Sequence, residues 1–151
     1  MPRRYILVTP AKNEEENLPR LIQSIASQML KPVLWVIVDD GSTDSTPKII
    51  KEARLKYPWI QSIRLNEGKR EMGKHYSYVC IKGFEYAREY CKLNDIKYDY
   101  IGLIDADMIP QNDYFYKLIR EFEKDARLGI ASGGVYYIAN NDYTQIFEEN
   151  R

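Results

Sequence analysis

The chain has 151 residues, with 22 lysines and arginines, 22 aspartates and glutamates and one histidine, so its formal net charge at pH 7 is zero. Balanced charge argues against a dedicated nucleic-acid-binding protein, because such proteins gain affinity by neutralising phosphates. Hydrophobic residues make up 44% and charged residues 29%, which excludes a mainly disordered chain and, at this length, predicts one domain with its own core.

Short apolar runs alternate with longer amphipathic segments along the chain. The apolar runs predict strands, since continuous runs rich in β-branched and aromatic residues are typical of parallel strands covered on both faces. The predicted strands span residues 5–9, 33–38, 60–65, 100–104 and, with a break at Gly133-Gly134, 130–138.

The segments between these strands carry apolar residues at helical spacing. They predict helices around residues 18–29, 49–57, 76–91 and 115–126. The expected N-caps are Asn17, Asp44 and either Asn112 or Asp113. Strands that alternate with helices in this way predict an α/β fold of Rossmann-like type, with a mostly parallel sheet and helices on both faces.

The two cysteines and the N-terminus indicate the compartment. Cys80 and Cys91 fall in one predicted helix about 16 Å apart, too far for a disulfide, so we expect buried free thiols as in a reducing compartment. The apolar run at residues 5–8 is too short for a signal peptide, and no run is long enough to span a bilayer. We therefore expect one cytoplasmic domain over residues 1–151.

Polar and charged residues follow four of the predicted strands. They lie at positions 9–14, 39–44, 66–74 and 105–107. In parallel sheets of this kind, ligands bind outside the carboxyl ends of the strands. The sequence therefore predicts a binding site at that edge.

Asp105-Ala106-Asp107 directly follows an apolar strand. If the strand geometry persists, residues two apart project to the same side, which brings the two carboxylates together. Hard oxygen ligands favour Mg²⁺ or Mn²⁺, with substrate phosphates completing the shell. The alternative is a solvated turn or a helix cap; the position after a buried strand favours metal binding.

The segment from Asp39 to Asp44 follows the second predicted strand. A helix-entry turn accounts for positions 41–44 but not for Asp39 and Asp40, whose carboxylates could accept hydrogen bonds from a nucleobase N–H or a ribose hydroxyl. The acidic pair also resembles the one that opens bacterial receiver domains. That interpretation is rejected, because Leu65-Asn66 stands where a phosphoacceptor aspartate would be needed.

The cationic segment 66–74 has two interpretations. It is either a solvated mobile loop or a flap whose Lys74 reaches a diphosphate as a point charge. His75 is expected to be a surface or helix-entry residue rather than a base. Tyr136 and Tyr137, near the expected cleft, could contact a substrate.

Three motifs in this order and spacing resemble those of family 2 glycosyltransferases of the GT-A fold. They are Pro10-Ala11-Lys12-Asn13-Glu14, Val36-Ile37-Val38-Asp39-Asp40-Gly41-Ser42-Thr43-Asp44 and Asp105-Ala106-Asp107. The resemblance covers the chain from about residue 5 to 138 and implies inverting transfer of a sugar from a nucleotide-diphospho-sugar to an acceptor hydroxyl.

The resemblance also implies a set of site residues. Those expected to bind the nucleotide sugar are Pro10, Lys12, Glu14, Asp39, Lys74, Asp105, Ala106 and Asp107. Asp39 would face the base and Lys74 the diphosphate. Asp105 and Asp107 would hold Mg²⁺ or Mn²⁺. Related enzymes often carry an aromatic residue where this chain has Lys12, so base stacking is not expected there.

No residue is assigned as the general base that an acceptor hydroxyl needs. Asp142, Glu148 and Glu149 stand in no recognisable acceptor motif. We therefore expect a donor-binding domain without the C-terminal acceptor-binding part, through which the protein could associate peripherally with a membrane. The alternative is a non-catalytic nucleotide-sugar-binding module or a fragment without transferase activity. A metal-dependent phosphatase is disfavoured, because the acidic motif follows the fourth strand and Ile109 stands where such enzymes carry Thr or Val.

Overall fold

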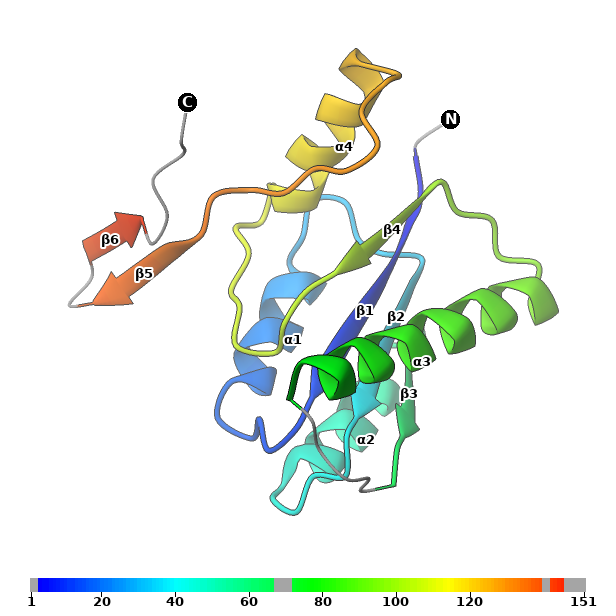
Figure 1. The fold of residues 1–151 in the computed structure, drawn as a ribbon, viewed down its shortest axis with the longest axis vertical. Helices are drawn as coiled ribbons and strands as arrows, with labels where there is room; N and C mark the ends of the chain where they lie inside the picture. Colours follow the sequence, from blue (N-terminus) through cyan, green and yellow to red (C-terminus); the bar gives the residue numbers. More distant parts are fainter. Residues whose placement is uncertain (1–2, 67–71, 140–141, 146–151) are drawn as a thin grey trace.

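The computed structural model describes residues 3–66, 72–139 and 142–145. Its centre is a four-stranded parallel sheet in the order β3-β2-β1-β4 (Figure 1). The strands are β1 (Tyr5–Ala11), β2 (Leu34–Asp39), β3 (Ile60–Arg64) and β4 (Tyr100–Leu103). The first four predicted strands are thus confirmed.

Helices cover both faces of this sheet, as predicted (Figure 1). The four helices are α1 (Leu18–Ala26), α2 (Thr46–Lys56), α3 (Met72–Leu93) and α4 (Tyr114–Lys124). Helices α1, α2 and α4 pack on one face, and α3 packs on the other. The α/β prediction is confirmed.

The two faces follow from the alternation of side chains along each strand. In β1, Tyr5 and Leu7 pack toward α1, α2 and α4, whereas Ile6 and Val8 pack toward α3. All four side chains are buried. Because both faces need apolar cover, β1 is a continuous apolar run rather than an alternating one.

Helix α3 lies very close to the sheet at Gly83. A Cβ added there would stand 2.4 Å from Val8 Cγ1 and 2.8 Å from Val38 Cγ2. Only glycine fits this contact, which fixes the height of α3 above β1 and β2. The first turn of α3 is thereby held near the carboxyl ends of these strands.

The predicted fifth strand over residues 130–138 is wrong in its start and in its pairing. Strand β5 (Tyr136–Ala139) begins after the Gly133-Gly134 break and pairs antiparallel with β6 (Asp142–Gln145) in a separate sheet. Ile130 is 87% exposed. Glycines weaken a strand, so Gly133 and Gly134 interrupt the β-forming run of this segment.

The expected helix caps are only partly realised. Asn17 and Asp113 occupy N-cap positions, but neither side chain makes a capping hydrogen bond. Before α2, Ser45 is the N-cap residue, and Asp44 Oδ1 accepts the Thr46 amide at 2.9 Å. The helices were therefore predicted better than the hydrogen bonds that cap their N-termini.

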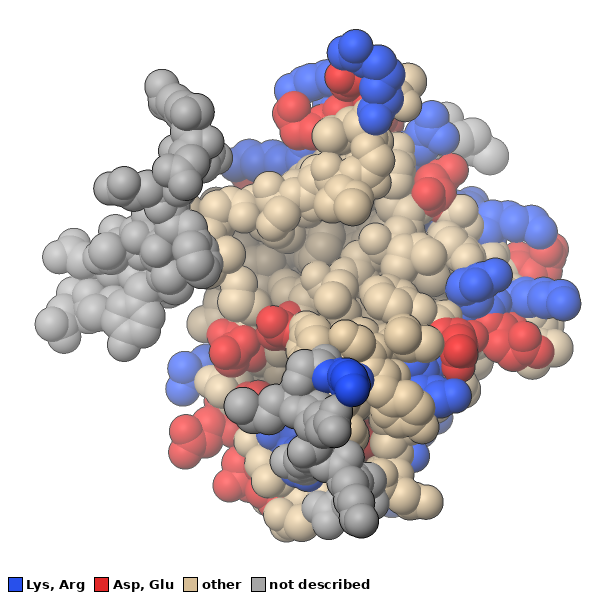
Figure 2. All heavy atoms as spheres, in the orientation of Figure 1, with Lys and Arg blue, Asp and Glu red and all other residues tan. Residues whose placement is uncertain are grey.

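Cys80 and Cys91 are both buried free thiols in α3, as predicted. Within the described ranges, no helix combines the length and apolar character needed to cross a membrane. Figure 2 shows charged side chains mainly around the rim of this face of the molecule, and uncharged residues over its centre, where Figure 1 places β4.

Candidate functional site

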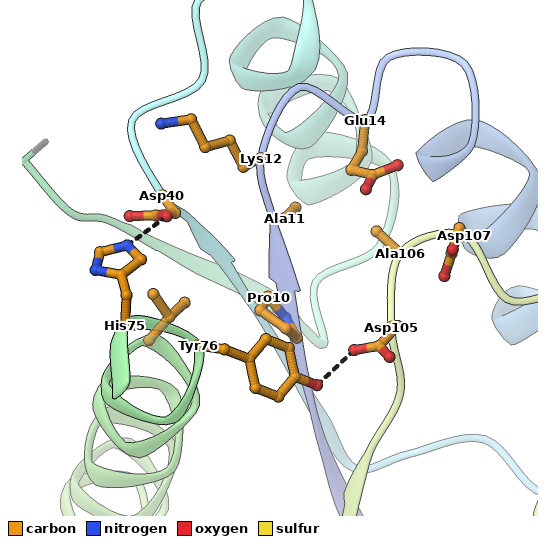
Figure 3. A pocket seen from close by; sticks show the side chains of 11 residues that line it. Pro10, Ala11, Lys12, Glu14, Asp40, His75, Tyr76, Asp105, Ala106 and Asp107 are labelled. Carbon is orange, nitrogen blue, oxygen red and sulfur yellow. Dashed lines mark hydrogen bonds and ion pairs between the residues drawn. The ribbon is translucent and has the colours of Figure 1, made fainter. Parts of the chain in front are cut away.

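A cavity of about 360 Å³ lies at the carboxyl edge of the sheet. It is bounded by the residues that follow β1, β2 and β4 and by the first turns of α3 (Figure 3). The lining residues are Pro10, Ala11, Lys12, Glu14, Asp40, His75, Tyr76, Val79, Asp105, Ala106 and Asp107. The edge predicted from the strand pattern is therefore where the cavity lies.

The segments after β1 and β2 are joined by hydrogen bonds to backbone amides. The Asn13 amide donates to Ser42 Oγ at 3.0 Å, and Asn13 Oδ1 accepts the Thr43 amide at 2.8 Å. The Glu14 amide donates to Thr46 Oγ1 at 2.9 Å. Asn13 adopts a positive φ of 52°, which asparagine tolerates better than most residues. The motifs at residues 10–14 and 36–44 are therefore bonded to each other, and together they form the β1–β2 side of the cavity.

Asp39 is 3% exposed and does not line the cavity. Its Oδ1 accepts the Ser42 amide at 2.9 Å, and its Oδ2 pairs with Arg64, which also donates to the Ser42 carbonyl at 2.9 Å. In this structure Asp39 thus connects the end of β2 to the end of β3. The expectation that it faces a nucleobase stays a prediction.

The neighbouring residue, Asp40, does line the cavity. His75 Nε2 lies 2.7 Å from Asp40 Oδ2, and the two side chains are only 16% and 10% exposed. Since a carboxylate can only accept, Nε2 carries the hydrogen of this bond. His75 lies in the first turn of α3, as expected, but it is mostly buried rather than a surface residue.

Asp105 and Asp107 line the cavity from the segment after β4. Strand β4 ends at Leu103, and a turn closed by the Met108 amide on the Asp105 carbonyl, at 3.2 Å, contains both residues. The predicted extension of strand geometry is therefore wrong. A turn, rather than the pleat of a strand, brings the two carboxylates to the same cavity (Figure 3).

Tyr76 crosses the cavity from α3 to Asp105 (Figure 3). Its hydroxyl donates to Asp105 Oδ1 at 2.6 Å. Burial, together with the hydrogen bond and negative charge of Asp105, raises the pKa of Tyr76 above its ordinary value. The hydroxyl is therefore protonated near neutral pH and acts as a donor.

The other predicted site residues are placed as follows. Pro10, Lys12 and Ala106 line the cavity, as does Glu14, whose Oε2 accepts Asn17 Nδ2 at 2.9 Å. Lys74 lies in the first turn of α3, exposed and outside the lining. The rest of the predicted flap, residues 67–71, lies outside the described residues. Tyr136 is exposed at the start of β5.

The donor set at Asp105 and Asp107 fits a hard divalent cation. Two carboxylates facing one cavity supply the oxygen ligands that Mg²⁺ and Mn²⁺ prefer, leaving positions for water and phosphate oxygens. No group of three acidic, histidine or cysteine ligands gathers anywhere in the described part of the chain. The residues present therefore suit a cation shared with a bound phosphate rather than one enclosed by protein.

Sequence reasoning did not assign His75 and Tyr76 to the site. Tyr76 is the first residue of the helix expected over residues 76–91, and it is 44% exposed and lines the cavity. Their position is the signal that could have indicated a role in the site, because both residues directly follow the predicted site residue Lys74 at the start of α3.

Two curated relatives match nearly all of this chain. A 4,4'-diaponeurosporenoate glycosyltransferase of Staphylococcus haemolyticus (strain JCSC1435) is 28% identical over 142 residues, covering 93% of this chain and 34% of that protein. The protein of the same name from Staphylococcus aureus (strain USA300) is 28% identical over 138 residues, covering 91% and 33%. The chain thus spans about one third of their length.

Solved structures share the fold. S. aureus TarS (1-349) superposes with a TM-score of 0.62 at 20% identity, covering 80% of this chain and 32% of that one. The mannosyltransferase PcManGT from Pyrobaculum calidifontis, in complex with GDP-Man and Mn²⁺, gives a TM-score of 0.56 at 21% identity, covering 81% and 33%. These likenesses confirm the expected GT-A type of α/β fold. The model of the family described as Glycosyl transferase family 2 matches residues 6–149, and the chain belongs to that family.

Proposed function

We propose that this chain is the donor-binding domain of a glycosyltransferase, which binds a nucleotide-diphospho-sugar in the cavity at the carboxyl edge of the sheet. The observation that carries the proposal is that Lys12, Asp40 and Asp107, from three different strand ends, line one cavity. Solved structures of similar fold hold UDP-GlcNAc or GDP-Man with Mn²⁺, which supports the same class of ligand here.

The proposed site assigns a role to each group. The nucleoside lies against Pro10, Lys12 and Glu14, with Ala106 at the turn. Asp39, which does not line the cavity, is kept as the predicted partner of the base. Lys12 and Lys74 supply positive charge toward the diphosphate, while Asp105 and Asp107 hold Mg²⁺ or Mn²⁺. When bound there, the cation offsets the negative charge that develops on the leaving diphosphate.

The proposed reaction is an inverting transfer. An acceptor hydroxyl attacks the anomeric carbon from the side opposite the diphosphate, the new C–O bond forms as the bond to the diphosphate oxygen breaks, and a base removes the hydroxyl proton. The cavity residues of this chain orient the donor and stabilise the leaving group. None of them is assigned as the base.

Calorimetry with UDP-, GDP- and dTDP-sugars, with and without Mn²⁺, tests the donor site. We expect one of these nucleotides to bind more tightly with Mn²⁺, and Asp107→Ala to abolish that gain. Glu52→Ala, which removes an exposed carboxylate on α2, serves as the control and keeps the gain. The proposal fails if no nucleotide binds better with the metal than without it.

A second candidate function is donor binding without transfer. The observation that favours it is that no residue lining the cavity is assigned as the base. Incubation of the chain with its donor and a panel of hydroxyl acceptors separates the two. A glycosylated product excludes the second candidate, whereas donor hydrolysis alone does not.

A further inference from the structure

Tyr76 makes a contact that the roles proposed above leave unexplained. Its hydroxyl spans from α3 to the turn after β4 and donates to Asp105 Oδ1 at 2.6 Å (Figure 3). The residue lines the cavity and is 44% exposed, so the contact lies at the site rather than inside the core. A tyrosine that served only to pack the core would not place its hydroxyl against a carboxylate of the cavity.

The helical turn that carries Tyr76 is itself fixed in two ways. The preceding residue, His75, is hydrogen-bonded to Asp40 at the end of β2, at 2.7 Å. Two turns further along α3, Gly83 packs against Val8 and Val38 without room for a Cβ. The Tyr76 hydroxyl therefore reaches Asp105 from a rigid base, which makes the contact suitable for orienting a side chain.

A carboxylate offers two oxygens, and the Tyr76 hydroxyl occupies one of them. Among the described residues, no side chain donates a hydrogen bond to the other oxygen, Oδ2 of Asp105. The Tyr76 contact thus divides the Asp105 carboxylate into one oxygen bonded to protein and one available to a ligand in the cavity.

We propose that Tyr76 is a positioning residue, which holds Asp105 so that a single oxygen is offered to the donor nucleotide and its cation. This inference rests on the proposed function. Mg²⁺ and Mn²⁺ sites accept carboxylates through one oxygen in octahedral geometry, whereas Ca²⁺ is larger and readily takes both oxygens of one carboxylate. Tyr76 therefore favours the smaller cations over Ca²⁺.

The test is calorimetric binding of UDP, GDP and dTDP to the full chain with Mn²⁺ or Ca²⁺. Tyr76→Phe should weaken nucleotide binding with Mn²⁺ about fivefold or more and lower the ratio of affinities with Mn²⁺ and Ca²⁺. Combining Tyr76→Phe with Asp105→Asn should weaken binding no further than Asp105→Asn alone, because Tyr76 acts through Asp105.

Tyr116→Phe is the matched control. Tyr116 is 42% exposed on α4 and does not line the cavity, so removing its hydroxyl should leave both affinities unchanged. Thermal unfolding of each variant monitors stability. The ratio between the two cations does not depend on how much of the protein is folded, so it reports positioning even if Tyr76→Phe is less stable.

The outcomes separate this inference from the proposed function. If the original chain binds none of the three nucleotides with Mn²⁺, the proposed function fails and the inference with it. If it binds nucleotide with Mn²⁺ but Tyr76→Phe matches Tyr116→Phe in affinity and in cation ratio, the positioning role is overturned while the donor site stands. Additive losses in the double variant would also overturn it.

Discussion

The two sides of the cavity are built differently. On one side, the segments after β1 and β2 bind each other through backbone amides and short side chains, as Asn13 does with Ser42 and Thr43. On the other side, α3 reaches the turn after β4 through the long side chain of Tyr76, whose hydroxyl bonds to Asp105.

This difference separates a preformed wall from an adjustable one. Hydrogen bonds to backbone amides fix the chain itself, so we expect the β1–β2 side to keep its shape when a ligand binds. A tyrosine side chain has rotatable bonds, so the other side can adjust while the Tyr76 hydroxyl stays bonded to Asp105. We therefore expect the side that carries the proposed cation ligands to be the one that responds to a ligand.

The largest effect on stability is expected from displacing α3, the helix that carries the adjustable wall. Gly83→Val should lower the free energy of unfolding by about 3 kcal/mol, because its side chain would overlap Val8 and Val38. Urea denaturation measures this loss. Gly129→Val is the control, since nothing lies within 4 Å of its added Cβ. An equal loss at both positions would contradict the close packing of α3.

A smaller effect is expected from removing the link between α3 and β2. His75→Ala should cost about 2 kcal/mol of stability, because it deprives the mostly buried Asp40 of its hydrogen-bond donor. His75→Gln, which keeps a donor, should recover part of the loss. Thermal unfolding measures both variants, and identical values for Ala and Gln would show that the Asp40 contact does not matter.

The preformed wall can be weakened at Asn13. Asn13→Ala should destabilise the chain by about 1–2 kcal/mol, since it loses the bond to the Thr43 amide and places alanine at a φ of 52°. Asn13→Gly removes the same hydrogen bond but tolerates the angle, so it should be less damaging. Chemical denaturation compares the two variants. If Asn13→Gly is less stable than Asn13→Ala, the positive φ at this position does not account for the loss.

The smallest effect concerns the two cysteines of α3. Burial raises the pKa of both Cys80 and Cys91, so neither should react appreciably with iodoacetamide in the native protein at neutral pH, whereas both should react in urea. On prolonged labelling, Cys80 should react first, because it lies one turn from Tyr76 on the adjustable wall. Mass spectrometry resolves the order, and earlier labelling of Cys91 would reverse this expectation.

The sequence predicted the sheet well and the far end of the chain poorly. Strands β1 and β2 were found because a parallel strand covered on both faces is nearly continuously apolar. Strands β3 and β4 are interrupted by Gln61, Ser62 and Gly102 and were found from their β-branched and aromatic residues. The segment from Ile130 failed because its apolar residues are interrupted by glycines, and its pairing depended on β6 rather than on the sheet. The local sequence pattern does not specify which other strand a short strand pairs with.

Of the acidic pair at the end of β2, the sequence analysis assigned Asp39 to the site, whereas in the structure Asp40 is the member that lines the cavity. Both have the same chemistry, and one residue along the chain decides which way each carboxylate turns. The structure directs Asp39 to Arg64 and Ser42, and Asp40 to His75 and the cavity. The role of Asp39 toward a base stays a prediction that nucleotide binding by Asp39→Asn would examine.

What the sequence determined by itself was the first four strands, the four helices and the edge of the sheet where polar and charged residues gather. Apolar periodicity and motif position are local properties of the chain. Only the tertiary structure decided which side chains meet across that edge. His75 bonds to Asp40, 35 residues away in the sequence, and Tyr76 bonds to Asp105, 29 residues away. Both contacts form because Gly83 allows α3 to pack closely against the sheet. Contacts of that kind depend on how elements pack, which no local pattern encodes.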